Sequence, residues 1–153
     1  MGRTLVIGVG NPILSDDGVG LEVARKIKAF LPGVDSCEEE NLGLNLLDSV
    51  IGYEQVLIID SIKIKDAEPG TLFKLSVDDL KSSLHLSSPH TVNLPTSIEI
   101  GKRLGLNLPK ITIYAIQIED NQTFCENLTP KVRRRVGEIV GEILEDLKNK
   151  KKI

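Results

Sequence analysis

The chain has 153 residues, a length typical of one compact domain whose core needs no disulfide bonds. Hydrophobic residues make up 41% of the sequence and aromatic residues only 3%, so we expect a core of Ile, Leu and Val. The net charge of −3 argues against a broad nucleic-acid interface, because a basic surface supplies most of the affinity for phosphates.

Cysteine spacing and hydropathy bear on the cellular compartment. Cys37 and Cys125 are far apart and form no CxxC pair, so we expect two free thiols and no zinc finger. No apolar run approaches the roughly 20 residues of a membrane helix. The apolar segment after Arg3 is followed by Asn-Pro and two aspartates, not by the small-residue cleavage site of a signal peptide. We therefore expect a soluble, cytoplasmic protein that contacts no membrane.

The first half of the chain alternates strand-like and helix-like segments. Thr4–Val9 is a short β-branched run that ends at Gly, Asn and Pro, so it is predicted to be a buried strand. Asp17–Phe30 is predicted to be a helix, because its apolar residues share one helical face. These residues are Val19, Val23, Ala24, Ile27 and Phe30. A second strand is expected at Val34–Glu39 and a short helix at Leu44–Ile51.

The second half continues the alternation. Gln55–Asp60 contains Val-Leu-Ile-Ile and is the best candidate for a strand buried on both faces. Pro69-Gly70 is a turn signal, and the strand expected at Thr71–Val77 should pair antiparallel, because too few residues precede it for a helical crossover. A helix, a strand and a final helix complete the prediction. They lie at Pro95–Leu104, at Ile111–Ile118 and from Thr129-Pro130 to about Lys148.

This order of elements predicts an α/β fold in which residues 1–153 form a single domain. We expect a three-layer sandwich: a mostly parallel, twisted sheet of about five strands with one antiparallel strand, and helices on both faces. The sequence shows no internal repeat and no linker that would divide it into two domains.

Acidic side chains follow two of the predicted strands. Asn11, Asp16 and Asp17 come after the first strand, and Asp60 ends the third. Ligands of open α/β sheets bind at the carboxyl ends of the strands, where the strand order reverses. If the first and third strands are neighbours, about 4.8 Å apart, Asp17 and Asp60 converge on one point.

A histidine could complete this cluster. The loop Ser87–Thr91 precedes a predicted helix, and its turn-forming residues could bring His90 to the same edge. Two carboxylates and one imidazole, with open positions, suit a divalent metal that must also meet a substrate.

The same residues also have ordinary structural explanations. Asp16 and Asp17 precede a predicted helix, where acids cap amides and favour the helix dipole. Asp60 could close an Asx turn at the end of its strand. His90 could be a simple loop residue, and His85 competes with it as a ligand.

Two other sites were weighed on sequence motifs. Gly8-x-Gly10 after the first strand resembles the start of a dinucleotide-binding GxGxxG, and the acids at 38–40 fall near the distance expected of a ribose-binding carboxylate. However, Ile13 replaces the third glycine, and two aspartates lie where pyrophosphate would need positive charge. Ser15 has no histidine nearby to activate it, and the GxSxG, HExxH and P-loop motifs are absent from the sequence. We expect no dinucleotide cofactor.

Several motifs together resemble one family. Residues 6–20, VIGVGNPILSDDGVG, are similar to the N-terminal signature of the hydrogenase maturation proteases. Weaker matches follow in the family's order. They are LIIDS at 57–61, PGT at 69–71, SPH at 88–90, YAIQIE at 114–119 and LTP at 128–130.

The resemblance implies a function and a partner. Members of this family remove a short C-terminal extension from the large-subunit precursor of nickel–iron hydrogenases after nickel has been inserted. The nickel belongs to the substrate protein and acts as a recognition element, and zinc or cadmium can substitute for it in vitro. We therefore expect a monomeric endopeptidase; the alternative is a non-catalytic escort module of the same fold that binds a metalloprotein.

The resemblance also implies which residues act. The family's metal-contacting acid, acid and histidine fall on Asp17, Asp60 and His90, which are the expected metal-binding and catalytic residues. Family members often have Asp-Gly-Gly after the second strand, where this chain has acids at 38–40. Glu38 aligns best with that Asp and is a further catalytic candidate, with Asp16 as the other carboxylate that could move a proton. Near Gln117 the family's Gln-Pro is Gln-Ile here.

Overall fold

A mixed β-sheet forms the centre of the computed structural model, which describes residues 2–82, 86 and 88–151. In these residues the sheet has five strands in the order β2-β1-β3-β5-β4. β4 is antiparallel to β5, and all other neighbours are parallel. The strands are β1 (Thr4–Val9), β2 (Asp35–Glu39), β3 (Gln55–Ile62), β4 (Leu72–Leu75) and β5 (Lys110–Gln117). The predicted mostly parallel sheet, with one antiparallel strand after the turn at 69–70, is confirmed.

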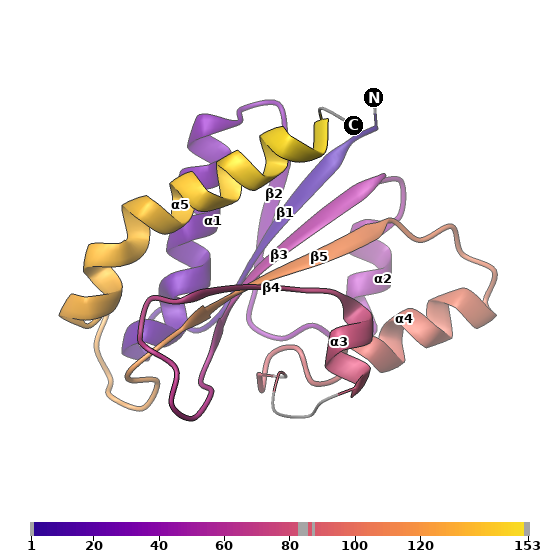
Figure 1. The fold of residues 1–153 in the computed structure, drawn as a ribbon. Coiled ribbons are helices and arrows are strands. Elements are labelled where there is room, and N and C mark those ends of the chain that lie inside the picture. The colour runs from indigo at the N-terminus through magenta and orange to yellow at the C-terminus, as the bar shows by residue number, and fades with distance from the viewer. Residues whose placement is uncertain (1, 83–85, 87, 152–153) are drawn as a thin grey trace.

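Helices cover both faces of the sheet, as predicted (Figure 1). α1 (Val19–Phe30) and α5 (Pro130–Lys151) pack on one face. The other face is covered by three shorter helices. They are α2 (Asn45–Val50), α3 (Val77–Ser82) and α4 (Leu94–Arg103). A 3-10 turn, η1 (Ser15–Gly18), lies between β1 and α1. No helix in the described part of the chain is both long and apolar enough to cross a bilayer.

The core is divided into two layers by the alternation of side chains along β3. Val56 and Ile58 belong to the cluster under α2 and α4, whereas Leu57 and Ile59 belong to the cluster under α1 and α5. All four side chains are fully buried. Successive residues of a strand point to opposite faces, so an uninterrupted apolar run is what a central strand covered on both sides requires.

The structure corrects the end of one predicted element. The strand expected over Thr71–Val77 ends at Leu75, and Val77 begins α3, a helix that was not predicted. The side chain of Asp79 accepts the N–H of Ser76, and the Ser76 hydroxyl accepts the N–H of Asp79. These reciprocal bonds are a capping box, with Asp in place of the usual Glu or Gln. The predicted strand therefore extended two residues beyond the end of β4.

Two glycines allow the chain to turn tightly from β1 into α1. Gly10 has a φ of +151°, and a Cβ there would lie 2.1 Å from the carbonyl oxygen of Asp17. A Cβ on Gly20 would lie 2.3 Å from the Ile59 carbonyl oxygen and 2.7 Å from that of Val9. α1 therefore begins directly against the carboxyl ends of β1 and β3. This close packing explains the glycines without a bound phosphate.

Candidate active site

Asp17, Asp60 and His90 come together at the carboxyl edge of the sheet, between β1 and β3. Asp17 lies in η1 and Asp60 in β3, while His90 lies in the segment that leads into α4. The Nε2 atom of His90 lies 2.9 Å and 3.0 Å from the two carboxylate oxygens of Asp17. Asp17 is 6% exposed and Asp60 2%. The convergence expected from the strand order is therefore present in the structure.

The carboxylate of Asp60 lies beside this pair but has partners of its own. One oxygen accepts the N–H of Ser61 at 2.8 Å, and the other accepts the hydroxyl of Ser88. The Ser61 hydroxyl donates to Asp17 at 3.2 Å, so this serine connects the two acids. Among the described residues, no three His, Cys, Asp or Glu side chains are arranged as they stand to hold a metal ion. Carboxylate oxygens and an imidazole nitrogen are donors that divalent metals accept, and here these donors bind one another, Ser61 and Ser88.

Backbone contacts orient the ring of His90. Its Nδ1 atom lies 2.5 Å from the carbonyl oxygen of Glu40, an acceptor, so Nδ1 carries the proton. The N–H of Leu42 donates to the carbonyl of His90 at 2.9 Å. The segment after β2 therefore holds the histidine at both its ring and its backbone, and Nε2 faces Asp17.

Burial and hydrogen bonding change the acidity of all three groups. Burial raises the pKa of Asp17, but hydrogen bonds from His90 and from the Asn11 N–H lower it to a net value below the ordinary range. The hydrogen bond with Asp17 raises the pKa of His90 to about 9, against the effect of burial. Burial raises the pKa of Asp60 to about 7, although the Ser88 hydrogen bond opposes the rise. At neutral pH, Asp17 and His90 thus form an ion pair.

Asp16 has a structural role that is separate from the cluster. Its carboxylate is fully buried and accepts the N–H groups of Glu119, Asp120 and Thr129 at 2.7–3.1 Å, as well as the Thr129 hydroxyl. It therefore joins η1 to the chain after β5 and to the start of α5. No side-chain bond from Asp16 caps its own helical turn, which was the simpler structural expectation.

Asn11 shapes the loop that carries Asp17. Its side-chain oxygen accepts the N–H of Ile13 at 3.1 Å, which forms an Asx turn. Its own N–H donates to Asp17 at 3.0 Å, and its amide nitrogen lies 3.4 Å from the carboxylate of Glu40. The loop after β1 is thereby tied both to Asp17 and to the end of β2.

The structure does not bring Glu38 into the cluster. Both of its carboxylate oxygens are bound by Arg25 of α1, at 2.6 Å and 2.7 Å. This hydrogen-bonded ion pair lowers the pKa of Glu38. Its strand partner is Gly8, one residue before the end of β1. A catalytic role for Glu38 stays a prediction, and it would require the pair with Arg25 to open.

Three contributors to the site were missed by sequence reasoning: the Glu40 carbonyl, Ser61 and Ser88. The two serines lie beside residues that were singled out, and this adjacency was the signal that could have found them. A backbone carbonyl such as that of Glu40 carries no side-chain signature. His85, the competing ligand, and Ser87 lie outside the described residues.

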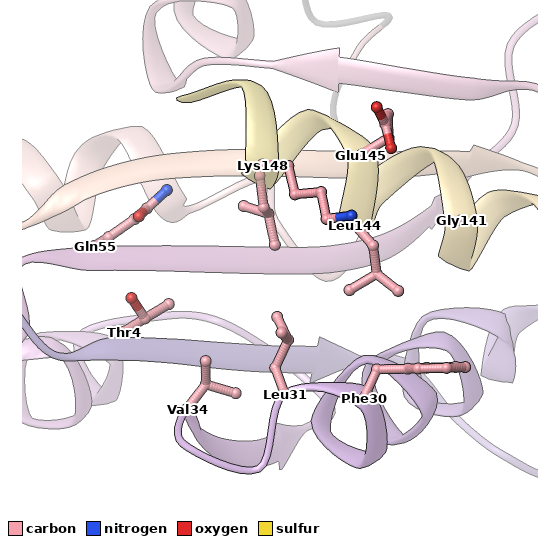
Figure 2. A pocket seen from close by; sticks show the side chains of 10 residues that line it. Thr4, Phe30, Leu31, Val34, Gln55, Gly141, Leu144, Glu145 and Lys148 are labelled. Carbon is pink, nitrogen blue, oxygen red and sulfur yellow. The ribbon is translucent and has the colours of Figure 1, made fainter. Parts of the chain in front are cut away.

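The structure also has a cavity of about 440 Å³, whose lining side chains are shown in Figure 2. It is lined by Thr4 and Gln55 at the amino ends of β1 and β3, and by Phe30, Leu31 and Leu144 of the α1 and α5 region. The lining is mainly apolar, apart from Glu145 and Lys148, and holds no histidine or cysteine. It therefore offers no chemistry comparable with that of the cluster at the opposite edge.

Comparisons with known proteins identify the family. A family model described as hydrogenase maturation protease matches residues 41–146. The hydrogenase 2 maturation protease of Escherichia coli strain K12 is 25% identical over 95% of this chain and 91% of its own length. The solved E. coli hydrogenase-maturating endopeptidase HybD has a TM-score of 0.78 at 24% identity, covering 97% of this chain and 93% of that one. The NiFe hydrogenase maturation protease HybD of Thermococcus kodakarensis has a TM-score of 0.76 at 25% identity, covering 95% and 98%. The three similar proteins named above are described as proteases or endopeptidases, and this protein belongs to the hydrogenase maturation protease family.

Proposed function

We propose that this protein removes the C-terminal extension of a nickel–iron hydrogenase large-subunit precursor, and that it uses the precursor's nickel to recognise its substrate. The observation that carries the proposal is the convergence of Asp17, Asp60 and His90 at the switch point between β1 and β3. Membership of the hydrogenase maturation proteases supports the class of reaction.

The donor set suits an incoming nickel ion. Imidazole nitrogen and carboxylate oxygen are ligands that first-row divalent metals accept, and three of them leave positions open for the precursor's own groups. Binding would require His90 to exchange its bond with Asp17 for the metal, and Asp60 to turn from Ser88. Zinc or cadmium should occupy the same ligands in vitro.

Binding the nickel would place the adjoining peptide bond of the precursor at the cluster, which is a positioning effect. The ion of the substrate could polarise the peptide carbonyl or a water molecule. Of the two carboxylates predicted to move a proton, Asp16 is held by four donors and Glu38 by Arg25. We therefore expect Glu38→Gln to retain most of the activity.

The test is cleavage of a nickel-loaded large-subunit precursor, followed by the size of the product. Wild type should cleave, whereas Asp17→Asn, Asp60→Asn and His90→Ala should each lose at least 100-fold in rate, on the order of what metal ligands and their supports contribute. Asp48→Asn, an exposed acid on α2, is the matched control.

Two outcomes would contradict the proposal in different ways. Full cleavage by all three variants would contradict the assignment of the site but leave the assignment of protease activity standing. Failure of the wild-type protein to cleave any hydrogenase precursor would favour the escort module, which binds the metalloprotein without cutting it.

A further inference from the structure

Exposed apolar side chains occur on the loops around the Asp17–His90 pair. Ile13 is 47% exposed, Phe124 82%, Leu44 59% and Val92 48%. Single exposed apolar residues are common on protein surfaces, so exposure by itself means little. What requires an explanation is that four such side chains lie on the segments that build one polar site.

The first pair, Ile13 and Phe124, lies on two loops that are joined to each other. The N–H of Cys125 donates to the carbonyl of Ile13 at 2.9 Å, and the N–H of Ser15 donates to that of Cys125 at 2.8 Å. These bonds form a parallel bridge between Leu14 and Cys125. Ile13 and Phe124 each lie next to a residue of this bridge. They therefore belong to two loops that are joined beside η1, the turn that carries Asp17.

The exposed ring of Phe124 stands on a structured loop. The carboxylate of Asp120 accepts the N–H groups of Gln122 and Thr123 at 2.9 Å and 3.0 Å, and the Thr123 hydroxyl at 2.6 Å. The hydroxyl of Ser15 donates to the carbonyl of Asn127 at 3.2 Å. The loop is therefore fixed on both sides of Phe124, whose side chain is 82% exposed.

The second pair, Leu44 and Val92, belongs to the other face of the sheet. Val92 is two residues from His90, and the carbonyl of His90 accepts the N–H of Leu42, two residues before Leu44. Leu44 leads into α2 and Val92 leads into α4. In Figure 1 the loops after β1 and β5 lie below α1 and α5, and the segments before α2 and α4 lie on the opposite side. The Asp17–His90 contact bridges the two sides.

We propose that Ile13 and Phe124 on one side, and Leu44 and Val92 on the other, form the docking surface for an extended apolar segment of the precursor next to the cleaved bond. The proposal rests on the proposed function, because the segments that carry the four side chains are hydrogen-bonded to the residues of the candidate active site or to the loops that hold them. An extended peptide sends successive side chains to opposite sides. A segment lying across the Asp17–His90 pair would therefore place alternate apolar side chains against the two pairs.

The test measures KM and kcat separately for cleavage of the nickel-loaded precursor. Phe124→Ser and Val92→Ser should each raise KM about tenfold, which corresponds to about 1.4 kcal/mol of lost apolar contact, and leave kcat within about twofold. Phe124→Leu should recover most of the affinity. Leu104→Ser and Phe30→Ser are matched controls, because these side chains are 69% and 67% exposed but lie at the end of α4 and at the end of α1. Both controls should behave as wild type.

A direct binding measurement separates this inference from the proposed function. If wild type binds the precursor without cutting it, and Phe124→Ser weakens that binding about tenfold, the docking surface stands and the protease assignment fails. If wild type cleaves and Phe124→Ser and Val92→Ser keep the wild-type KM, the docking surface is overturned and the protease assignment stands. An equal rise in KM in the Leu104→Ser and Phe30→Ser controls would also overturn the docking surface, because the effect would then be a general one of removing exposed apolar side chains.

Discussion

Two adjacent aspartates in the same turn have different roles. Asp17 faces the histidine of the candidate site, whereas Asp16 is fully buried and accepts four hydrogen bonds from the chain beyond β5. The side chains diverge because η1 is a tight 3-10 turn, in which consecutive residues point in different directions. One residue can therefore be replaced to test folding and the other to test function.

Asp16→Ala should destabilise the protein strongly. The substitution leaves the N–H groups of Glu119, Asp120 and Thr129 without their acceptor, and a buried donor left unsatisfied costs about 1–3 kcal/mol. We expect a loss of about 3 kcal/mol in the free energy of unfolding, measured by urea denaturation. Asp48→Asn should change it by less than about 0.5 kcal/mol. A wild-type unfolding midpoint for Asp16→Ala would contradict the assigned structural role.

At the scale of elements, the site depends on how closely α1 approaches the sheet. Gly20 lies against the carbonyls of Val9, the last residue of β1, and of Ile59, where the pairing of β3 with β1 ends. The carbonyl of Gln117 likewise accepts the N–H of Gly70, and the Gln117 side chain bonds both backbone groups of Ile64. Helix, loop and strand ends are thus held together at the edge that carries the candidate residues.

Gly20→Ala tests this close approach. The added methyl group would overlap two backbone oxygens that cannot move independently of the sheet, so we expect a loss of about 2–3 kcal/mol in stability. Gly137→Ala is the matched control, since a Cβ at that position on α5 meets nothing within 4 Å. It should stabilise the protein by roughly 0.5–1 kcal/mol, as Ala does in an exposed helix. Thermal unfolding of the two variants should therefore shift in opposite directions.

The loop after β5 should respond to acid through Asp120. Hydrogen bonds from Thr123 and Gln122 lower the pKa of Asp120 to about 2. A carboxyl whose folded-state pKa is lowered stabilises the fold above its unfolded pKa, near 4, and loses this contribution as the pH falls through about 2.

Melting temperatures of wild type and Asp120→Asn should show the effect. At pH 6 the wild type should have a higher melting temperature than Asp120→Asn. The difference between the two melting temperatures should disappear as the pH falls from about 4 to 2. A difference that stays constant over this range would mean that the charge of Asp120 does not stabilise the loop. Glu126→Gln, in the same loop, controls for a general loss of negative charge.

For the whole molecule, the sheet brings together residues that are distant in sequence. The His90–Asp17 contact joins positions 73 residues apart, and the Asp16–Thr129 contact joins positions 113 apart. Two separate hydrophobic clusters on the faces of the sheet fix these distances. The site therefore exists only in the folded chain, and a ligand that binds it should stabilise the fold as a whole.

Zinc or cadmium should raise the melting temperature of the wild-type protein. A metal at 100 times its Kd would add about 2.7 kcal/mol to the free energy of unfolding. His90→Ala should lose most of this shift, and NAD should produce none. An unchanged shift in His90→Ala would place the metal elsewhere on the protein.

The sequence by itself predicted the sheet, its single antiparallel strand and, for neighbouring first and third strands, the convergence of Asp17 and Asp60, whereas His90 was favoured over His85 mainly by the family resemblance. The physical reason is that apolar runs must be buried on both faces, and that parallel strands bring their carboxyl ends to one edge. The start of α3 was not predicted. It depends on the reciprocal hydrogen bonds between Ser76 and Asp79, which are local and polar and do not appear in the pattern of apolar residues.

Only the tertiary structure decided what each polar group contacts. Arg25 draws Glu38 away from the cluster, Asp16 reaches backbone groups more than a hundred residues ahead, and a carbonyl of residue 40 orients His90. Nearly every residue has the same backbone donor and acceptor, so no pattern of residue types predicts which backbone group a side chain will contact. The exposed apolar side chains likewise gain a meaning only when the loops that carry them are brought around one site.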